Sequence, residues 1–204
     1  NTTIGNNNIF LNNNKIGELG VQSHINYDNF EFKYNGLIIG NNNFFHVSNI
    51  IFNGYEDKTI IGDNNKFLSE VTIHHDTIIK NNVILYPRSI TAGFSKLLDN
   101  SVMGMNSSIQ QRQVLGQYSM IGMNNPATHN VFPFFIYFNN QYIRYNTHII
   151  PEDFEINKIN LKRIINYIKD NSFDQYIINE INNLPKNIKG PILEFYNSLN
   201  NHKI

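Results

Sequence analysis

The stretch "IGDNNKFLSEVTIHHDTIIKNNVILYPRSI", residues 61 to 90, opens a run in which an apolar residue returns at every sixth position. An α-helix repeats every 3.6 residues and a strand every two, so neither explains a sustained period of six. A hexapeptide repeat is typical of a β-helix, in which three short strands and their turns close one triangular coil. The positions on this period are Ile61, Phe67, Ile73, Ile79, Leu85, Thr91, Leu97, Met103, Ile109, Leu115, Ile121 and Ala127.

The period also appears before residue 61, at Ile4, Phe10 and Ile16 and again at Ile39, Phe45 and Ile51. The spacing across the two gaps is not a multiple of six, so we expect loops near residues 23–38 and 53–60. Loops on a rigid scaffold are where binding groups tend to lie. Glycine often follows the period residue, and we expect these glycines to fit the corners of the coil, where they are conformationally permissive. Asparagine, which is abundant, tolerates left-handed backbone angles there.

After about residue 130 the period stops, and the aromatic stretch "VFPFFIYFNNQYI" predicts an extended connector packed on the last coil. The apolar spacing then becomes helical. Ser172 with Gln175 indicates a capping box that opens a second helix, which Pro185 ends, and Pro191 indicates the start of a third.

The predicted fold is therefore mainly β. A β-helix domain spans residues 1–130, and a connector and a C-terminal α-helical domain span residues 131–204.

Bulk composition excludes several classes of protein. Sixteen basic and sixteen acidic residues give no net charge, which argues against a nucleic-acid or membrane-surface partner. The absence of cysteine excludes a disulfide scaffold, a thiolate zinc site and a cysteine nucleophile. No apolar run reaches the eighteen or so residues of a membrane span, and no secretory signal opens the chain. We expect a soluble, cytoplasmic protein, and the histidine spacings indicate no metal site.

Residues eighteen apart lie in one column of the coil, about 4.8 Å apart per turn. His75, Gly93 and Gln111 form such a column. Gly93 exposes backbone between two polar side chains, so its N–H is a candidate oxyanion donor beside His75 as a candidate base. Asp76 is placed to orient the imidazole. The alternative is that His75 is a solvated corner residue, which is the commoner role of a lone histidine at a turn.

Met105 and Met123 form another column, which we expect either to line an apolar slot or simply to pack. His74 has no column partner of this kind, so we interpret it as structural or accessory.

The ordered motifs "VTIHHD", "TAGFS", "SSIQQR", "MIGMNN", "VFPFFI" and "INLKR" resemble the UDP-N-acetylglucosamine acyltransferases of lipid A biosynthesis. The resemblance runs from residue 1 to the helical tail and lacks the family's first few N-terminal coils. It implies a left-handed β-helix with a C-terminal helical domain, a homotrimer, and active sites between subunits. The period of six alone is shared by many acyltransferases, whereas the ordered set of motifs is more specific.

The resemblance implies roles for the catalytic column. His75 matches the family's general base, Asp76 matches the aspartate that follows it, and Gly93 matches the glycine whose N–H is the oxyanion donor. Gln111 matches a glutamine that contacts the substrate.

The resemblance also implies binding residues elsewhere. "FEFKY" resembles a loop segment that would place Glu31 and Lys33 near the sugar and its nucleotide phosphates. Asn157, Lys162 and Arg163 match a motif whose basic residues meet the phosphate of the donor's pantetheine arm or the carrier protein.

Several polar residues of the family are replaced here. Thr72, Phe94, Gln110 and Phe52 each stand where the family has a histidine near the substrate. Ile164 stands where the family has a second arginine.

These departures argue for a different sugar or acyl group. Met123 matches a position that tunes acyl length, and a bulky methionine there implies a short chain.

Three functional hypotheses remain open. The first is transfer of a short acyl group, with acetyl slightly preferred, from a CoA or acyl-carrier-protein thioester to the sugar of a UDP- or dTDP-linked amino sugar. The second is a UDP-N-acetylglucosamine 3-O- or 3-N-hydroxyacyltransferase that uses acyl-acyl carrier protein. The third is a non-catalytic β-helix that binds sugar or serves as a scaffold.

Overall fold

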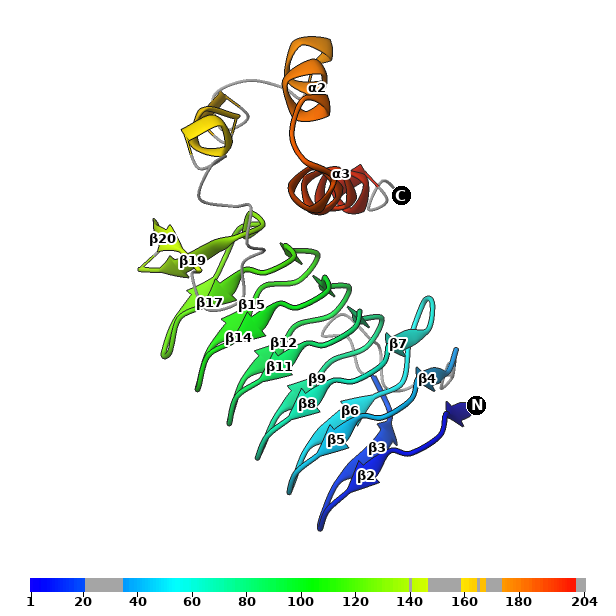
Figure 1. Cartoon of the computed structure of the whole chain (residues 1–204). Coiled ribbons are helices and arrows are strands. Elements are labelled where there is room, and N and C mark those ends of the chain that lie inside the picture. The colour runs from blue at the N-terminus through cyan, green and yellow to red at the C-terminus, as the bar shows by residue number, and fades with distance from the viewer. Residues whose placement is uncertain (21–34, 140, 147–158, 165, 168–173, 201–204) are drawn as a thin grey trace, which may run out of the picture.

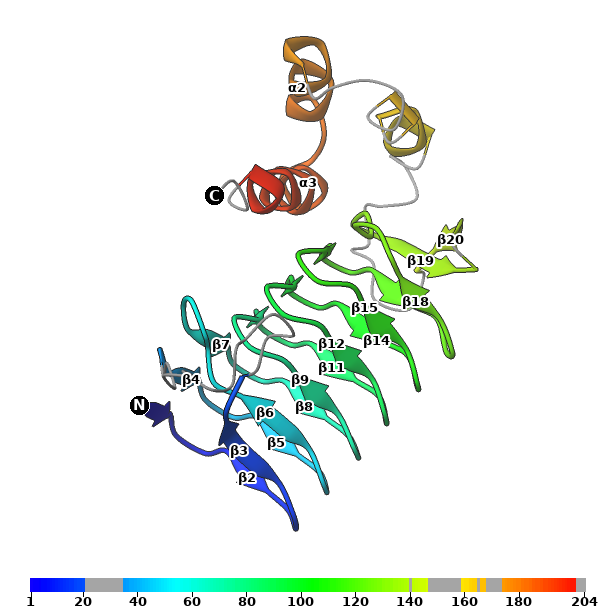
Figure 2. The same ribbon diagram turned by 180° about the vertical axis from the view of Figure 1, so that it is seen from behind.

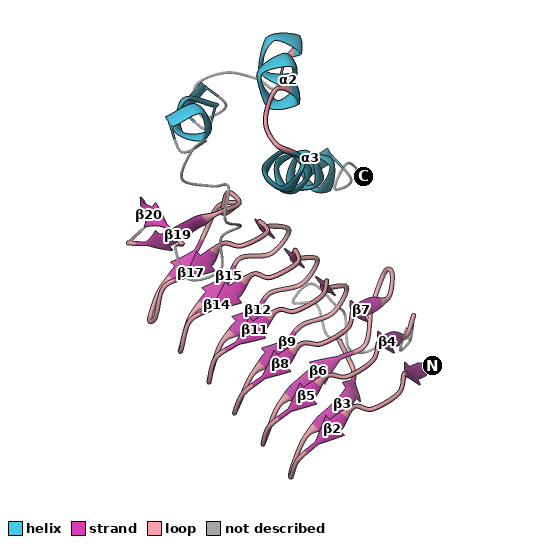
Figure 3. Ribbon diagram, viewed as in Figure 1, coloured by secondary structure: helices cyan, strands magenta, loops and turns pink. Residues whose placement is uncertain are grey.

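The computed structural model describes residues 1–20, 35–139, 141–146, 159–164, 166–167 and 174–200. Among the described residues, strands β1 to β18 wind into a left-handed parallel β-helix, and helices gather at the end of the coil that lies far from the N-terminus (Figure 1). The view from behind shows the same stacked coils, and the strands and helices occupy separate parts of the molecule (Figures 2 and 3). The fold class predicted from the period of six is confirmed.

Three sheets form the sides of the prism. The first holds β1 (Thr2–Ile4), β4 (Leu37–Ile39), β7 (Thr59–Ile61), β10 (Ile78–Ile79), β13 (Lys96–Leu97) and β16 (Val114–Leu115). The second holds β2 (Ile9–Phe10), β5 (Phe44–Phe45), β8 (Lys66–Phe67), β11 (Ile84–Leu85), β14 (Val102–Met103), β17 (Met120–Ile121), β19 (Phe135–Phe138) and β20 (Gln141–Tyr145). The third holds β3 (Lys15–Glu18), β6 (Ile50–Phe52), β9 (Thr72–Ile73), β12 (Ile90–Thr91), β15 (Ser108–Ile109) and β18 (Pro126–Ala127).

The side chains on the period of six fill the prism. All twelve, from Ile61 to Ala127, are at most 1% exposed. In the middle coils each pairs with the residue eighteen positions away, as Ile79 does with Ile61 and Leu97. Phe10, Phe45 and Phe67 stack in one column, with ring centroids 4.5 and 4.6 Å apart. The period therefore exists because one residue in six must face the dry axis of the coil.

Glycine occurs at the corners of the coil for a different reason from the conformational freedom that we expected. Of the glycines in the described residues, Gly17 and Gly36 have a positive φ, and Gly62 does not. A β-carbon on Gly62 would stand 2.6 Å from Asn81 Oδ1 and 2.8 Å from the Lys80 carbonyl oxygen of the next coil. Close approach of successive coils, rather than backbone conformation, therefore requires glycine there.

The left-handed residue lies three positions after each inward-facing one. From residue 64 to residue 124 a positive φ recurs at every sixth residue, at Asn64, Glu70, Asp76, Asn82, Arg88, Phe94, Asn100, Asn106, Arg112, Tyr118 and Asn124. Asparagine is the commonest of these, as expected from its tolerance of this region.

Other asparagines link the coils. Asn43 Oδ1 accepts the Asn65 N–H at 2.8 Å, and Asn65 Oδ1 accepts the Val83 N–H at 2.7 Å. These buried amides satisfy backbone groups at the corner that the strand hydrogen bonds do not reach.

The connector extends the second sheet, because β19 pairs in parallel with β17 and β20 folds back against it. The division of the chain at residue 130 stays a prediction. Of the two expected loops, the second occupies residues 53–58, since Thr59 and Ile60 belong to β7. Most of the first, residues 21–34, lies outside the described residues, and Leu37 already belongs to β4.

The helical segments begin where the local side chains dictate. Residues 159–164 and 166–167 are helical, followed by α2 (Gln175–Asn182) and α3 (Lys186–Asn200). Asp174 caps α2 by accepting the Ile177 N–H at 3.0 Å, so the capping box predicted at Ser172, which lies outside the described residues, is wrong. Pro191 lies inside α3 instead of opening it, because the Ile188 and Lys189 N–H groups already bond to the Pro185 carbonyl and start the helix earlier.

One apolar cluster joins the helices to the coil. It includes Leu98 and Val114 of the coil, the connector aromatics Phe132, Phe134 and Phe135, and Leu161, Ile164, Ile177, Ile181, Leu184, Ile188, Ile192 and Phe195 of the helical part. Ile164, the departure from the family's basic motif, is 1% exposed in this cluster, so its apolar identity serves packing. None of the helices in the described part of the chain has the length and apolarity that crossing a membrane requires.

Candidate active site

One edge of the prism carries the predicted catalytic column. It lies between the third sheet and the first, and we call it the His75 corner, consisting of residues 74–77, 92–95 and 110–113 in three successive coils. His75 and Asp76 are 6% and 5% exposed. A histidine and an aspartate this deeply buried need specific partners.

The two side chains are each other's partner. His75 Nδ1 lies 2.6 Å from Asp76 Oδ2. Burial by itself raises the pKa of Asp76, but the hydrogen bonds from His75 and from the Asp57 and Tyr55 N–H groups outweigh it and hold this pKa below its ordinary value. Asp76 is therefore ionised near neutral pH and can only accept. It follows that Nδ1 carries a proton, and in the neutral form of the imidazole Nε2 then presents its lone pair.

Nothing in the described residues occupies that lone pair, because His75 Nε2 has no hydrogen-bond partner there. A neutral imidazole with one nitrogen fixed by a carboxylate and the other free is the arrangement of a general base.

Three successive backbone N–H groups surround the Asp76 carboxylate. Asp57 donates to Oδ1 at 2.6 Å, Glu56 donates to Oδ1 at 3.0 Å, and Tyr55 donates to Oδ2 at 3.0 Å. The Asp76 N–H in turn donates to Thr59 Oγ1 at 2.9 Å. Asp76 therefore holds the 53–58 loop as well as the imidazole.

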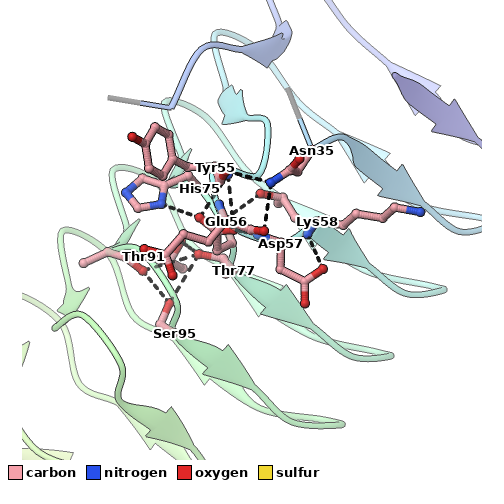
Figure 4. Close-up of polar contacts among 12 residues, drawn as sticks. Asn35, Tyr55, Glu56, Asp57, Lys58, His75, Thr77, Thr91 and Ser95 are labelled. Carbon is pink, nitrogen blue, oxygen red and sulfur yellow. Dashed lines mark hydrogen bonds and ion pairs between the residues drawn. The ribbon is translucent and has the colours of Figure 1, made fainter. Parts of the chain in front are cut away.

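The loop brings Tyr55 beside the imidazole, as Figure 4 shows. The two rings meet edge to face with centroids 6.2 Å apart. Asn35 fixes the loop from its other side, since Asn35 Nδ2 donates to the Tyr55 and Glu56 carbonyl groups at 2.7 and 2.8 Å. The order of this loop thus rests on Asp76 and Asn35 together.

Gly93 lies directly against the imidazole. A β-carbon there would stand 2.7 Å from His75 Cε1 and 2.8 Å from Nε2. The gap expected between His75 and Gln111 is therefore partly filled by the His75 ring itself. The Gly93 N–H has no acceptor among the described residues, so it is free to donate to a bound group near Nε2.

An aromatic ring and a cation complete the corner. Phe94 meets the His75 ring at 89° with centroids 5.3 Å apart. The Arg112 guanidinium lies over the Phe94 ring, with Cζ 4.5 Å from the ring centroid. Phe94, which stands where the family resemblance implies a histidine, thus forms an apolar wall beside His75.

His74 points elsewhere. Its ring stacks on Phe52 of the preceding coil, with centroids 5.0 Å apart. Burial, and to a smaller extent the neighbouring His75, lower the pKa of His74. His74 and Phe52 form a separate stacked pair, which agrees with the structural role expected for His74.

The other predicted residues of the catalytic corner are less enclosed. Gln110 and Gln111 are exposed, and Thr72 is half-buried on the outer face of β9. Met105 and Met123 are 46% and 53% exposed, and they lie on the edge between the second and third sheets. Within one chain the two methionines therefore do not line the His75 corner.

The binding residues implied in the loop and tail are only partly visible. Glu31, Lys33 and Asn157 lie outside the described residues. Lys162 and Arg163 are exposed on the first helix, and Arg163 donates to the Tyr176 hydroxyl at 2.7 Å.

Sequence reasoning missed Arg112 in the corner and three residues around it, Tyr55, Asn35 and Thr59. Tyr55 and Asn35 are placed by the course of the 53–58 loop, which leaves no spacing signal, and Thr59 accepts the Asp76 N–H from the neighbouring strand β7. Arg112 was within reach, because it lies eighteen positions after Phe94 in the same column. In the described part of the chain, no three His, Asp or Glu side chains group in a way that could hold a metal ion.

Known proteins resemble this chain in sequence and in fold. No protein-family model matches it. An acyl-[acyl-carrier-protein]–UDP-N-acetylglucosamine O-acyltransferase of Nautilia profundicola is 37% identical over 113 residues, which are 52% of this chain and 44% of that protein. The enzyme of the same name from Burkholderia orbicola is 32% identical over 103 residues, 49% of this chain and 39% of its own length. The matched stretch thus spans less than half of either relative.

Solved structures share all or most of the fold. The UDP-N-acetylglucosamine O-acyltransferase of Moraxella catarrhalis superposes with a TM-score of 0.79 at 20% identity, covering 98% of this chain and 79% of that one. An N-acyltransferase of Bacillus cereus, solved with dTDP and coenzyme A, superposes with a TM-score of 0.55 at 16% identity, covering 78% and 90%. The chain resembles the UDP-N-acetylglucosamine acyltransferases as a divergent relative.

Proposed function

We propose that this protein is an acyltransferase that moves an acyl group from a thioester of coenzyme A or acyl carrier protein to the sugar of a nucleotide-activated amino sugar. The observation that carries the proposal is the His75 corner, where Nδ1 is fixed on Asp76, Nε2 has no partner among the described residues, and Gly93, whose N–H has no acceptor there, lies against the ring. The names of the relatives support the same reaction class.

The reaction follows from this geometry. His75 Nε2 takes the proton from the acceptor hydroxyl or amine, whose oxygen or nitrogen then attacks the thioester carbonyl carbon. Charge builds on the carbonyl oxygen, where the Gly93 N–H donates to it. The carbon–sulfur bond breaks, and the imidazolium returns its proton to the leaving thiolate. Asp76 stabilises the imidazolium while it exists.

The acyl group is the finer part of the proposal. Phe52 and Phe94 stand where the resemblance implies histidines, and Met123 stands where it implies control of acyl length. These replacements favour a short acyl group, acetyl first, on a UDP- or dTDP-linked amino sugar. The second candidate is hydroxyacyl transfer from acyl carrier protein to UDP-N-acetylglucosamine, which the names of the curated relatives favour. Lys162 and Arg163, exposed on the first helix, would meet the phosphate of either donor.

The proposal includes a homotrimer. Met105 and Met123 lie on a different edge of the prism from His75, so they reach the acyl group only if a neighbouring subunit contributes its edge to the site. We expect a solution mass of three chains by light scattering. A monomeric enzyme with full activity would remove both methionines from the site.

The decisive experiment is mass spectrometry of nucleotide sugars incubated with the protein and either acetyl-CoA or hydroxyacyl carrier protein. We expect a product heavier by one acetyl group that forms only with the coenzyme. His75→Ala should lose roughly 10²- to 10⁴-fold in turnover, whereas His74→Phe, which keeps the stack on Phe52, should not. A hydroxyacyl product would establish the second candidate. Absence of any product with both donors would favour the non-catalytic sugar-binding or scaffold role.

A further inference from the structure

We propose that Arg112 is a phosphate-binding residue of the His75 corner and that the ring of Phe94 holds it in position. The inference rests on the proposed acyl transfer for the identity of the phosphate-bearing substrates, and on the geometry alone for the site itself.

Arg112 belongs to the same column as the catalytic groups. Asp76, Phe94 and Arg112 occupy the left-handed position of three successive coils, with φ of 58°, 60° and 62°. Phe94 contacts His75 with its ring, and the Arg112 guanidinium lies over Phe94. The ring of Phe94 therefore lies between the Arg112 cation and the His75 base, and Arg112 is the more exposed of the two.

Arg88 provides an internal comparison. It also occupies a left-handed corner position, with φ of 62°, and Glu70 lies below it in the same column. There the guanidinium is neutralised, since Arg88 Nε lies 2.7 Å from Glu70 Oε2. Arg112 has Phe94 where Arg88 has a carboxylate. Among the described residues, no Asp or Glu forms an ion pair with Arg112.

This difference leaves the donors of Arg112 available. A guanidinium that stacks on an aromatic ring uses its face, whereas its five N–H groups point outwards in its own plane. That fork matches two oxygens of a phosphate, and stacking reduces the side-chain freedom that binding would otherwise remove. The Arg112 side chain is half-exposed, so a ligand reaches it from solvent.

Both substrates of the proposed reaction carry phosphate. The acceptor carries a diphosphate on its sugar, and the thioester donor carries phosphate on its pantetheine arm. The chemistry recognised by Arg112 is the same for both, and binding measurements distinguish them.

The test measures affinities by calorimetry for UDP, coenzyme A and inorganic pyrophosphate. The proteins are the wild type, Arg112→Ala, Arg112→Lys and the matched control Arg88→Ala. We expect Arg112→Ala to weaken at least one of these probes by about tenfold or more, the loss typical of a charge-assisted hydrogen bond. Arg112→Lys should recover part of this affinity, and Arg88→Ala should stay within about twofold of the wild type.

The outcomes separate the sources and the two proposals. Loss for UDP alone assigns Arg112 to the acceptor, and loss for coenzyme A alone assigns it to the donor. Loss for pyrophosphate in a protein without any transferase activity keeps the phosphate site and removes the proposed function. Unchanged affinities in Arg112→Ala, equal losses in Arg88→Ala, or a wild type that binds none of the three at millimolar concentration would overturn the inference.

Discussion

The imidazole of His75 lies over the α-carbon of Gly93, so closely that a β-carbon there would stand 2.7 Å from the ring. One coil of the β-helix thus supplies the candidate base, and the next supplies the only kind of residue that leaves room for it. The candidate oxyanion donor and the base are placed together by the stacking of coils.

Gly93→Ala should displace the imidazole. Because the backbone on both sides is fixed in the coil, the ring must move by several tenths of an ångström or more, and we expect roughly a 10²-fold loss of turnover. The matched control is Gly190→Ala in α3, where an added β-carbon meets nothing within 4 Å. That variant should keep its activity and gain about 0.5–1 kcal/mol in stability. Equal turnover in the two variants would contradict the placement of the site.

Asp76→Asn should release the 53–58 loop. An amide cannot accept hydrogen bonds from three backbone N–H groups and from His75 as a carboxylate does. We therefore expect the free energy of unfolding to fall by about 1.5–3 kcal/mol. Hydrogen exchange of the Tyr55, Glu56 and Asp57 amides should become faster. The control is Asp57→Asn, because the exposed Asp57 carboxylate bonds only to the adjacent Lys58 N–H in the described residues. Unchanged protection in Asp76→Asn would show that other contacts order the loop.

The same carboxylate makes stability depend on pH in one direction. The pKa of Asp76 is lower in the folded protein than in the unfolded chain, where an aspartate has a pKa of about 3.9. The contribution of the Asp76 carboxylate to the free energy of unfolding is therefore complete above its pKa in the unfolded chain, and it is lost as pH falls towards its pKa in the folded protein. Denaturation of the wild type and Asp76→Asn should show a stability difference at neutral pH that shrinks on acidification through this window. A difference that grows instead would mean that the folded pKa is raised.

Phe67→Ala should test the core column. Phe67 is fully buried and stacks on Phe45 with centroids 4.6 Å apart. Deleting the ring leaves a cavity in a stack that cannot collapse. We therefore expect the free energy of unfolding, measured by chemical denaturation, to fall by about 3–5 kcal/mol. Lys66→Ala, on the exposed face of the same strand, should change stability by less than about 0.5 kcal/mol. A small effect of Phe67→Ala would mean that the coil repacks.

The sequence could predict what repeats. The period of six is visible in the sequence because the inward position of each hexapeptide is buried and must be apolar or small. His75, Gly93 and Gln111 form one column because one coil contains eighteen residues. The left-handed positions also repeat, although Glu70, Arg88 and Phe94 occupy them without any propensity for that conformation. Helix boundaries were harder to predict, since the Ser172 motif predicts an N-cap two residues before the observed one, Asp174.

By itself the sequence determined the coil, the loop before β7 and the identity of the candidate base, because each depends on local period and register. Only the tertiary structure decided what surrounds that base. Tyr55 reaches His75 through a loop whose course is set by Asp76 and Asn35, and Met105 and Met123 fall on another edge of the prism. Loop paths and contacts across the prism depend on groups far apart in the chain, and these leave no periodic trace in the sequence.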